Sequence, residues 1–469
     1  MINHSKRRVL AAFAVATAGA LVFAGCSGEA PEASEDDGPV TLTITANAIT
    51  GGKNAAEADW LADWVIPEFE AAMEEDGKDV TVEFEPQGVD DENYKTKIAL
   101  DLQSGEGADI IGMDGIWVGE FAEAGYIKPL ADVGGDSVDS WEGWDQIPEA
   151  VQNALSFDDE RYGVPQGADG RVLYYNKDLF EQAGLPADWQ PESWDDVLDA
   201  ARDLKKLDGV TPIQLNAGTA MGEATTMQGL LPLLVGTGEQ VYEDGKWVGD
   251  TDGLNDVLDL YKTIYIDEGL GDAVLQQEAA GRDTSFQLFA SNQIGILLEG
   301  DYFWRSVINP AEGVGTAPMA NRDDVVGYTK IPAMKPGSGV NDQDFVSMSG
   351  GTGRVLNPNS DHPELAWELL AFMNSADAYE ARNAGTLAIT PRTDVNDEML
   401  AEDPMLTYVS EEVLPITAYR PPLAAYPQVS TALQQASLDV VSGMSVADAA
   451  STYADAAKDI VGDDAVSGG

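Results

Sequence analysis

Residues 41–84 begin with Thr41-Leu-Thr-Ile-Thr45 and end with Val80-Thr-Val-Glu-Phe84, two strand-like runs on either side of a helix-like segment. Both runs alternate apolar and polar residues with a period of two, which is typical of β-strands. Large apolar residues recur between them at helical spacing: Trp60, Leu61, Trp64, Val65, Phe69 and Met73. Strands separated by ten or more helical residues form βαβ units and largely parallel sheets. The sequence therefore predicts an α/β fold.

Further short apolar runs along the chain are also predicted to be strands: residues 109–113, 172–175, 212–215 and 294–298. Ser193-Trp-Asp-Asp196 fits the start of a helix that continues to Leu204, because a serine and an acidic residue three positions later can cap a first turn. From Pro363 onward the pattern is mainly helical. Residues 40–469 form a segment that is too long for one compact hydrophobic core, so we expect two domains.

The first 25 residues are predicted to be a signal peptide and no part of the fold. Three basic residues precede an apolar run, residues 9–23, that is too short to span a bilayer comfortably and is not followed by stop-transfer charges. The basic residues are Lys6, Arg7 and Arg8.

The apolar run leads into Phe23-Ala-Gly-Cys26, which resembles a bacterial lipobox with Phe in place of the usual Leu. The resemblance implies cleavage before Cys26 and a lipid on its thiol, which would anchor the protein to a membrane. The alternative is an ordinary cleaved signal with an incidental cysteine. Residues 26–39 are rich in small and acidic residues, so we expect a flexible tether.

Composition excludes several classes of function. The formal net charge of −56 argues against nucleic-acid binding, which needs basic residues to neutralise phosphate, and fits a soluble secreted surface. Cys26 is the only cysteine, so an intrachain disulfide or a cysteine zinc site is impossible. His4 and His362 are the only histidines, which leaves little for histidine-dependent catalysis. We expect no metal site, no cofactor and no enzyme activity.

Five blocks occur in the order found in family-1 extracellular solute-binding proteins, the group that includes maltose and trehalose receptors, and resemble that family. The first runs from Asp109-Ile-Ile-Gly-Met-Asp114 through Trp117 and Glu120-Phe-Ala122 to Pro129-Leu130. The others are Tyr162-Gly-Val-Pro165 with Leu173-Tyr-Tyr-Asn-Lys-Asp-Leu-Phe180 and Ala183-Gly-Leu-Pro186, Phe286 to Trp304 with Gly300, Phe345 to Gly351, and Pro363 to Leu370.

The resemblance covers residues 40–460 and implies a periplasmic-binding-protein-like fold. Two α/β lobes would be joined by multiple hinge crossovers and enclose a ligand cleft. We expect lobe 1 to comprise residues 40–167 and 345–415, and lobe 2 to comprise residues 168–344 and 416–465. The implied function is the substrate-binding lipoprotein of an ABC sugar importer, a monomer that captures a sugar outside the cell by hinge closure and delivers it to a membrane permease. An oligosaccharide is favoured over a monosaccharide.

Carboxylates, amides and aromatic rings at strand ends are the groups that bind sugar hydroxyls and the flat C–H faces of the rings. Asp114 and Trp117 follow the strand that ends at Met113, where the family lines its cleft; the alternative is a helix cap and a packed indole. Asp169, in Gly167-Ala-Asp-Gly170, matches a hydroxyl-binding carboxylate of maltose-type relatives, or caps a turn. Asn47 and Asn216, each at a strand end, are weaker candidates.

The resemblance adds a second group of candidates from the later blocks. Tyr302 aligns with the family's stacking aromatic after Gly300, although Asp301 or Trp304 could equally face the sugar from the same turn. Gly350 and Gly351 resemble paired glycines that let the backbone approach a ligand, or form a tight hinge turn. Arg392 matches a frequently ligand-facing position, with a surface salt bridge as the alternative.

Three other functions stay open at this point. The same fold could bind a metal, a phosphorylated glycerol or a peptide, although few histidines, cysteines or basic residues are available for the first two. A secreted glycosidase could use a carboxylate pair such as Asp114 and Asp169, but nucleotide, zincin and nucleophile-elbow motifs are absent from the sequence. A lipid-anchored adhesion module would have a flat binding face and would not close on small ligands.

Overall fold

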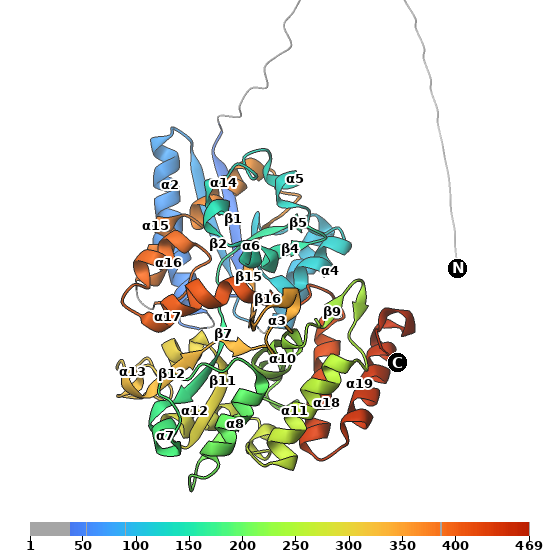
Figure 1. The fold of residues 1–469 in the computed structure, drawn as a ribbon. Coiled ribbons are helices and arrows are strands. Elements are labelled where there is room, and N and C mark those ends of the chain that lie inside the picture. Colours follow the sequence, from blue (N-terminus) through green and yellow to red (C-terminus); the bar gives the residue numbers. More distant parts are fainter. Residues whose placement is uncertain (1–37, 53, 90, 385–386, 469) are drawn as a thin grey trace, which may run out of the picture. The chain divides into compact units, whose positions relative to one another are not determined.

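The computed structural model describes residues 38–52, 54–89, 91–384 and 387–468 (Figure 1). The predicted signal peptide, the lipidation site Cys26 and nearly all of the predicted tether lie outside these residues. Within the described part, no helix combines the length and apolar character needed to cross a membrane.

The first sheet has five strands and contains the N-terminal βαβ units. Its strand order is β2 (Val80–Pro86), β1 (Val40–Ala46), β3 (Ile110–Asp114), β15 (Thr352–Leu356) and β6 (Gly163–Pro165). β1 pairs in parallel with β2 and β3, as the intervening helices predict. β15 is antiparallel to both of its neighbours.

The second sheet has four strands, in the order β12 (Val326–Thr329), β7 (Arg171–Asn176), β11 (Ile294–Gly300) and β8 (Thr211–Gln214). β11 and β8 are parallel, whereas β7 is antiparallel to both β11 and β12. The six runs predicted as strands all lie in or at the ends of observed strands, so their prediction is confirmed.

The prediction of largely parallel sheets is wrong. Antiparallel ladders form at β7 and β15, the two strands by which the chain enters one sheet directly from another part of the fold. Such strands have no crossover helix connecting them to their sheet neighbours, and that helix is what imposes the parallel direction. The periodicity of the sequence predicted where the strands lie, but it carries no information on the direction in which the chain re-enters a sheet.

A small third sheet lies where the chain passes between the two larger ones. It consists of β13 (Ile331–Pro332), β14 (Phe345–Ser349) and β16 (Thr417–Tyr419). One direct connection, residues 166–170, joins β6 of the first sheet to β7 of the second, and Gly350 and Gly351 join β14 to β15. The multiple crossovers expected between two α/β parts are therefore present. Two short hairpins complete the strands: β4 (Ser156–Phe157) with β5 (Glu160–Arg161), and β9 (Tyr242–Glu243) with β10 (Lys246–Trp247).

One set of helices belongs to the first sheet and its surroundings. Contacts join α2 to β2, α5 and α14 to β15, and α1 to α15. The bounds of this set are α1 Ala55–Trp60, α2 Ile66–Glu75, α3 Asp91–Ser104, α4 Val118–Glu123, α5 Leu130–Gly134, α6 Glu149–Gln152, α14 Pro363–Met373, α15 Ala376–Asn383, α16 Thr393–Met399 and α17 Pro404–Tyr408.

A second set packs around the second sheet. α7, α8 and α12 contact its strands, and α11, α18 and α19 pack on one another. The bounds are α7 Lys177–Ala183, α8 Trp194–Leu204, α9 Glu223–Thr225, α10 Leu231–Gly236, α11 Asp252–Lys262, α12 Gly281–Ala290, α13 Arg322–Val325, α18 Tyr426–Val441 and α19 Val446–Val461. The helical prediction for the chain beyond Pro363 is confirmed by α14 to α19.

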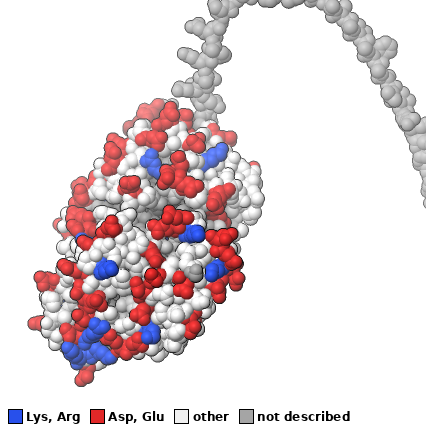
Figure 2. All heavy atoms as spheres, turned by 45° about the vertical axis from the view of Figure 1, so that its right-hand side comes forward, with Lys and Arg blue, Asp and Glu red and all other residues white. Residues whose placement is uncertain are grey.

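Charge on the surface follows the composition. Figure 2 shows Asp and Glu side chains spread over the face that it draws, with few Lys and Arg between them. Many of the basic side chains that the structure describes are paired with carboxylates, for example Lys78 with Glu368 at 2.8 Å and Arg202 with Glu268 at 2.6 Å. An arginine without a carboxylate partner is therefore an unusual feature of this molecule.

The predicted capping box at α8 is confirmed and gives a test of local stability. The Ser193 Oγ accepts a hydrogen bond from the Asp196 amide at 3.2 Å and donates to the Asp196 carboxylate at 3.0 Å. Ser193→Ala should lower the free energy of unfolding by about 1 kcal/mol, measured by urea denaturation. The matched control is Ser291→Ala at an exposed position, which should change it by less than about 0.5 kcal/mol. Equal values for the two variants would contradict the cap's contribution.

Candidate functional site

Two adjoining cavities lie at the carboxyl ends of strands β1, β3 and β6. Their volumes are about 660 Å³ and about 410 Å³. Both are lined by Asn54, Glu57, Gln166, Thr352 and Arg382, so we treat them as one site and call it the central hollow. Clefts at this edge of an α/β sheet are the usual ligand sites of such folds.

Five of the residues predicted from the sequence line the central hollow. They come from the ends of different strands that the fold brings together: Asn47, Asp114, Trp117, Asp169 and Gly350. The Asn47 Nδ2 donates to Asp91 at 2.9 Å, and its Oδ1 accepts from the Val89 amide at 3.2 Å. Trp117 is largely buried, with its ring centroid 6.3 Å from that of Tyr94.

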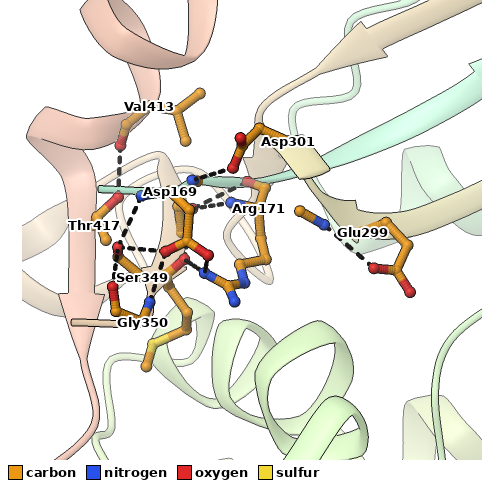
Figure 3. Close-up of polar contacts among 12 residues, drawn as sticks. Asp169, Arg171, Glu299, Asp301, Ser349, Gly350, Val413 and Thr417 are labelled. Atoms are coloured by element: carbon orange, nitrogen blue, oxygen red, sulfur yellow. Dashed lines mark hydrogen bonds and ion pairs between the residues drawn. The ribbon is translucent and has the colours of Figure 1, made fainter. Parts of the chain in front are cut away.

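Asp169 ties the crossing segment between β6 and β7 to the end of β14 (Figure 3). Its Oδ1 accepts hydrogen bonds from the Ser349 Oγ and from the Gly350 amide, both at 2.8 Å. Its Oδ2 lies 2.7 Å from Nη1 of Arg171, which also donates to the Met348 carbonyl at 3.1 Å. One carboxylate thus holds together two segments that lie far apart in the sequence.

Opposing effects act on the pKa of Asp169, and the effects that lower the pKa are stronger. Burial by itself raises the pKa of the carboxyl group, but the Arg171 guanidinium and the hydrogen bonds from Ser349 and Gly350 lower it below its usual value. Asp169 is therefore more stable as a carboxylate in the folded protein than in the unfolded chain.

Asp114 differs from Asp169 in its electrostatic environment. Burial raises the pKa of Asp114, although the Arg420 guanidinium partly opposes this shift. Arg420, directly after β16, lies 3.5 Å from the Asp114 carboxylate and 3.6 Å from the carboxylate of Glu223 at the start of α9. Asp114 ends a strand of the first sheet, whereas Glu223 follows a strand of the second, so Arg420 contacts carboxylates from both parts of the fold.

The later blocks contribute mainly buried residues. Asp301 is 1% exposed; its Oδ2 pairs with Nε of Arg305 at 2.9 Å, and its Oδ1 accepts from the Gly170 amide at 3.3 Å. Trp304 is also buried and donates its indole N–H to Asp403 at 3.1 Å. Of the aromatic rings in this turn, only that of Tyr302 stays partly exposed, with the Arg282 guanidinium 5.1 Å from its centroid.

The remaining candidates do not line the central hollow. Asn216 is buried and donates to Glu299 at 3.1 Å. The Gly351 carbonyl accepts from the Gly115 amide at 2.8 Å, and a Cβ at Gly351 would lie 2.5 Å from the Ala154 side chain, so close packing against Ala154 requires glycine. Arg392 is buried and pairs with Asp394, with N–O distances of 3.0 and 2.6 Å.

Sequence reasoning missed several polar residues of the site. Gln166 directly follows the recognised Tyr162–Pro165 block, and its position could have suggested it. Arg382 lies on α15 among residues with an ordinary surface pattern, and Arg420 follows a strand of three residues, so neither position carries a local signal. Both arginines acquire their contacts only through tertiary packing: Arg382 lines the central hollow, whereas Arg420 lines neither of its cavities and contacts Asp114, which does.

Another cavity, of about 670 Å³, is lined by residues of α6, α10, β16 and the segments beside them, among them Arg420, but by none of the residues predicted from the sequence. The central hollow is therefore the candidate ligand site. Within the part of the chain that the structure describes, no cluster of three or more His, Cys, Asp or Glu side chains is arranged to hold a metal ion.

The fold and the hollow agree with a known family. The sequence model for bacterial extracellular solute-binding proteins matches residues 30–380 of this chain. The chain belongs to this family.

Known proteins are similar to this chain in sequence or in fold. A putative binding protein of Brucella abortus is 24% identical over 437 residues, 91% of this solute-binding protein and 94% of the relative. The arabinooligosaccharide-binding protein of Halalkalibacterium halodurans is 27% identical over 264 residues, 55% of this chain and 54% of the relative. The crystal structure of the cyclic α-maltosyl-1,6-maltose binding protein of Arthrobacter globiformis superposes with a TM-score of 0.69 at 21% identity, covering 91% of this chain and 100% of that one. The periplasmic-binding-protein-like fold is thereby confirmed.

The Asp169 network predicts a loss of stability when its charge is removed. Asp169→Asn leaves the buried Arg171 guanidinium without its carboxylate, so the free energy of unfolding should fall by about 2–4 kcal/mol. The matched control is Asp139→Asn, whose carboxylate is 68% exposed and pairs with Arg161 at the surface; it should cost less than about 1 kcal/mol. Urea denaturation of both variants measures the difference, and equal losses would contradict the role of Asp169.

The same variant gives a prediction for pH. Because the pKa of Asp169 is lowered on folding, its ionisation stabilises the protein at every pH above the ordinary aspartate pKa of about 3.9. This contribution is lost as the pH falls through the folded-state pKa. The stability difference between the wild type and Asp169→Asn should therefore be constant between pH 5 and 7 and shrink in more acidic solution. A difference that grows on acidification would contradict the sign of the shift.

Proposed function

We propose that this solute-binding protein is the substrate-binding subunit of an ABC sugar importer and captures an oligosaccharide in the central hollow. The observation that carries the proposal is the set of groups in that hollow: carboxylates, side-chain amides and an indole, all at the ends of strands. Relatives whose names state an oligosaccharide ligand support the same class of solute.

The chemistry of the hollow suits a sugar. Hydroxyl groups both donate and accept hydrogen bonds, so they need carboxylates and amides together, and charge-assisted bonds to carboxylates are the stronger ones. Asp114 and Asn47 offer such groups at the edge of the first sheet, and Trp117 offers an aromatic surface beside them. Tyr302, which follows β11, lines neither cavity of the hollow.

The arrangement around Arg420 supports capture by hinge closure. Its guanidinium lies between Asp114 and Glu223, which belong to different parts of the fold, at distances too long for tight pairs. A sugar that contacts both parts would stabilise the arrangement in which they lie closest, because only there are all its hydrogen bonds made. The closed form would then deliver the sugar to a permease.

The location outside the membrane follows the family, and we propose lipid anchoring through Cys26 with residues 26–39 as the tether. A monomer suffices for this function. The rival glycosidase would need two free carboxylates, whereas that of Asp169 is already bonded to Ser349, Gly350 and Arg171. A metal, a peptide or a phosphorylated glycerol remains as an outcome of the binding test.

The ligand class can be tested by a thermal-shift screen on residues 39–469, which form one compact unit. The panel comprises mono- and oligosaccharides, glycerol phosphate, peptides and divalent metal ions. A ligand present at about 100 times its Kd should stabilise the fold by about 2.7 kcal/mol, which is readily visible as a rise in Tm. A rise with an oligosaccharide series supports the proposal. A rise with only a metal, a peptide or glycerol phosphate would overturn it.

Asp114→Asn separates binding from stability. Because the pKa of Asp114 is raised on folding, its ionised form is less favourable in the folded state, so this variant should match or exceed the wild-type Tm at pH 7. Loss of a charge-assisted acceptor should weaken binding of the sugar found in the screen by about ten- to a hundredfold, measured by calorimetry. An unchanged Kd would remove Asp114 from the binding site.

A further inference from the structure

Arg382 is the basic residue that lines both parts of the central hollow. A guanidinium has five N–H donors, and the structure shows one hydrogen bond from this side chain, in which Nη1 donates to the Gln166 carbonyl at 2.8 Å. Among the residues that the structure describes, no carboxylate lies within 4.0 Å of it. Most of its hydrogen-bonding capacity is therefore uncommitted.

Packing holds Arg382 in place. Its guanidinium lies 5.3 Å from the centroid of the Trp60 ring, close enough for a cation–π interaction. Trp60 is itself fixed, because its indole N–H donates to the Ala378 carbonyl at 3.1 Å, one turn before Arg382 on α15. A guanidinium held in this way loses little conformational freedom when a ligand binds it.

A second observation indicates that acceptor groups are missing from this wall of the hollow. Gln166 lines both cavities and is only 5% exposed, yet its Nε2 donor has no hydrogen-bond partner. Buried donors without acceptors are costly, so a built site normally supplies the acceptor.

The charges around the hollow are otherwise paired. Arg354 pairs with Glu57 at 2.5 Å, Asp169 with Arg171, and Arg305 with Asp301. Asp114 lies 3.5 Å from Arg420. Burial lowers the pKa of Arg354 to about 10 despite Glu57, and the charge of Arg382 adds to the lowering, so the two guanidiniums repel each other. An additional negative charge beside Arg382 would relieve that repulsion.

We propose that the sugar bound in the central hollow carries a carboxylate, as in a uronic acid unit, which pairs with Arg382 and accepts from Gln166. The inference rests on the proposed sugar-binding function and names the class of sugar. In a chain with a net charge of −56, a positive group without a carboxylate partner inside a polar cavity is best explained by an anion in its ligand.

The chemistry favours a carboxylate over other anions or a neutral sugar. A planar carboxylate matches the fork of a guanidinium and can accept two parallel hydrogen bonds. A phosphate ester carries nearly two charges, whereas one guanidinium at this wall is uncommitted. A neutral hydroxyl would leave the positive charge of Arg382 uncompensated.

The test compares acidic and neutral sugars of the same shape. Titration calorimetry on residues 39–469 would use trigalacturonate, its methyl ester and galactotriose, together with the corresponding glucuronate, mannuronate, glucose and mannose oligomers. An acidic oligomer should bind about ten- to a hundredfold more tightly than its neutral partner. Arg382→Gln should remove that preference, and Arg382→Lys should restore it in part. Arg202→Gln, at an exposed surface arginine, is the matched control and should leave the preference intact.

The outcomes distinguish this inference from the proposed function. If neutral oligomers bind as tightly as acidic ones, or if Arg382→Gln weakens both equally, the carboxylate is excluded and the sugar-binding function stands. If sugar phosphates bind and uronates do not, the anion is a phosphate and the inference is overturned. If neither member of any pair binds, this inference is overturned, and the thermal-shift screen decides on the proposed function independently.

Discussion

The ion pair and hydrogen bonds of Asp169 are the constraint on which the arrangement of the site depends. The segment that carries Asp169 joins the two sheets, and Ser349 and Gly350 lie at the end of the strand from which the chain returns to the first sheet. Because a single carboxylate binds both segments, their relative position is fixed to within hydrogen-bond distances. Arg171 compensates its charge, and without that compensation burial would favour the neutral acid.

The Asp169 network lies at the edge of the central hollow, so residues that hold the two segments together also line the candidate site. Gln166 and Asp169 line the hollow from the connection between the sheets, and Gly350 lines it from the return. Any rotation between the two parts of the fold must change backbone torsion angles in these short connecting segments. A ligand that touches Asp114 on one side and groups after β11 on the other would therefore act directly on the segments that set their separation.

The periodicity of the sequence predicted the strands, the α8 cap and the late helices, because these depend on local patterns that the printed residues contain. Strand direction in β7 and β15 could not be predicted, since it depends on how the chain re-enters a sheet. Resemblance to the family pointed to Asp114 and Asp169, which lie at strand ends or turns. It could not reveal Arg382 or Arg420, because each acquires its partners from segments more than 150 residues away in sequence.

The two aspartates show how similar residues acquire different roles from their surroundings. Asp169 is stabilised as a carboxylate by donors within the protein, so its hydrogen bonds and ion pair contribute to the stability of the fold. Asp114 is destabilised as a carboxylate by burial, and the Ile116 amide at 3.2 Å and the Arg420 guanidinium at 3.5 Å do not fully compensate it, so it gains from donors that a ligand brings. Arg382 is the complementary case, a guanidinium with five N–H donors for which the structure shows one acceptor, the Gln166 carbonyl. A solute that supplies hydroxyl donors to Asp114 and an acceptor to Arg382 would satisfy both sides of the hollow at once.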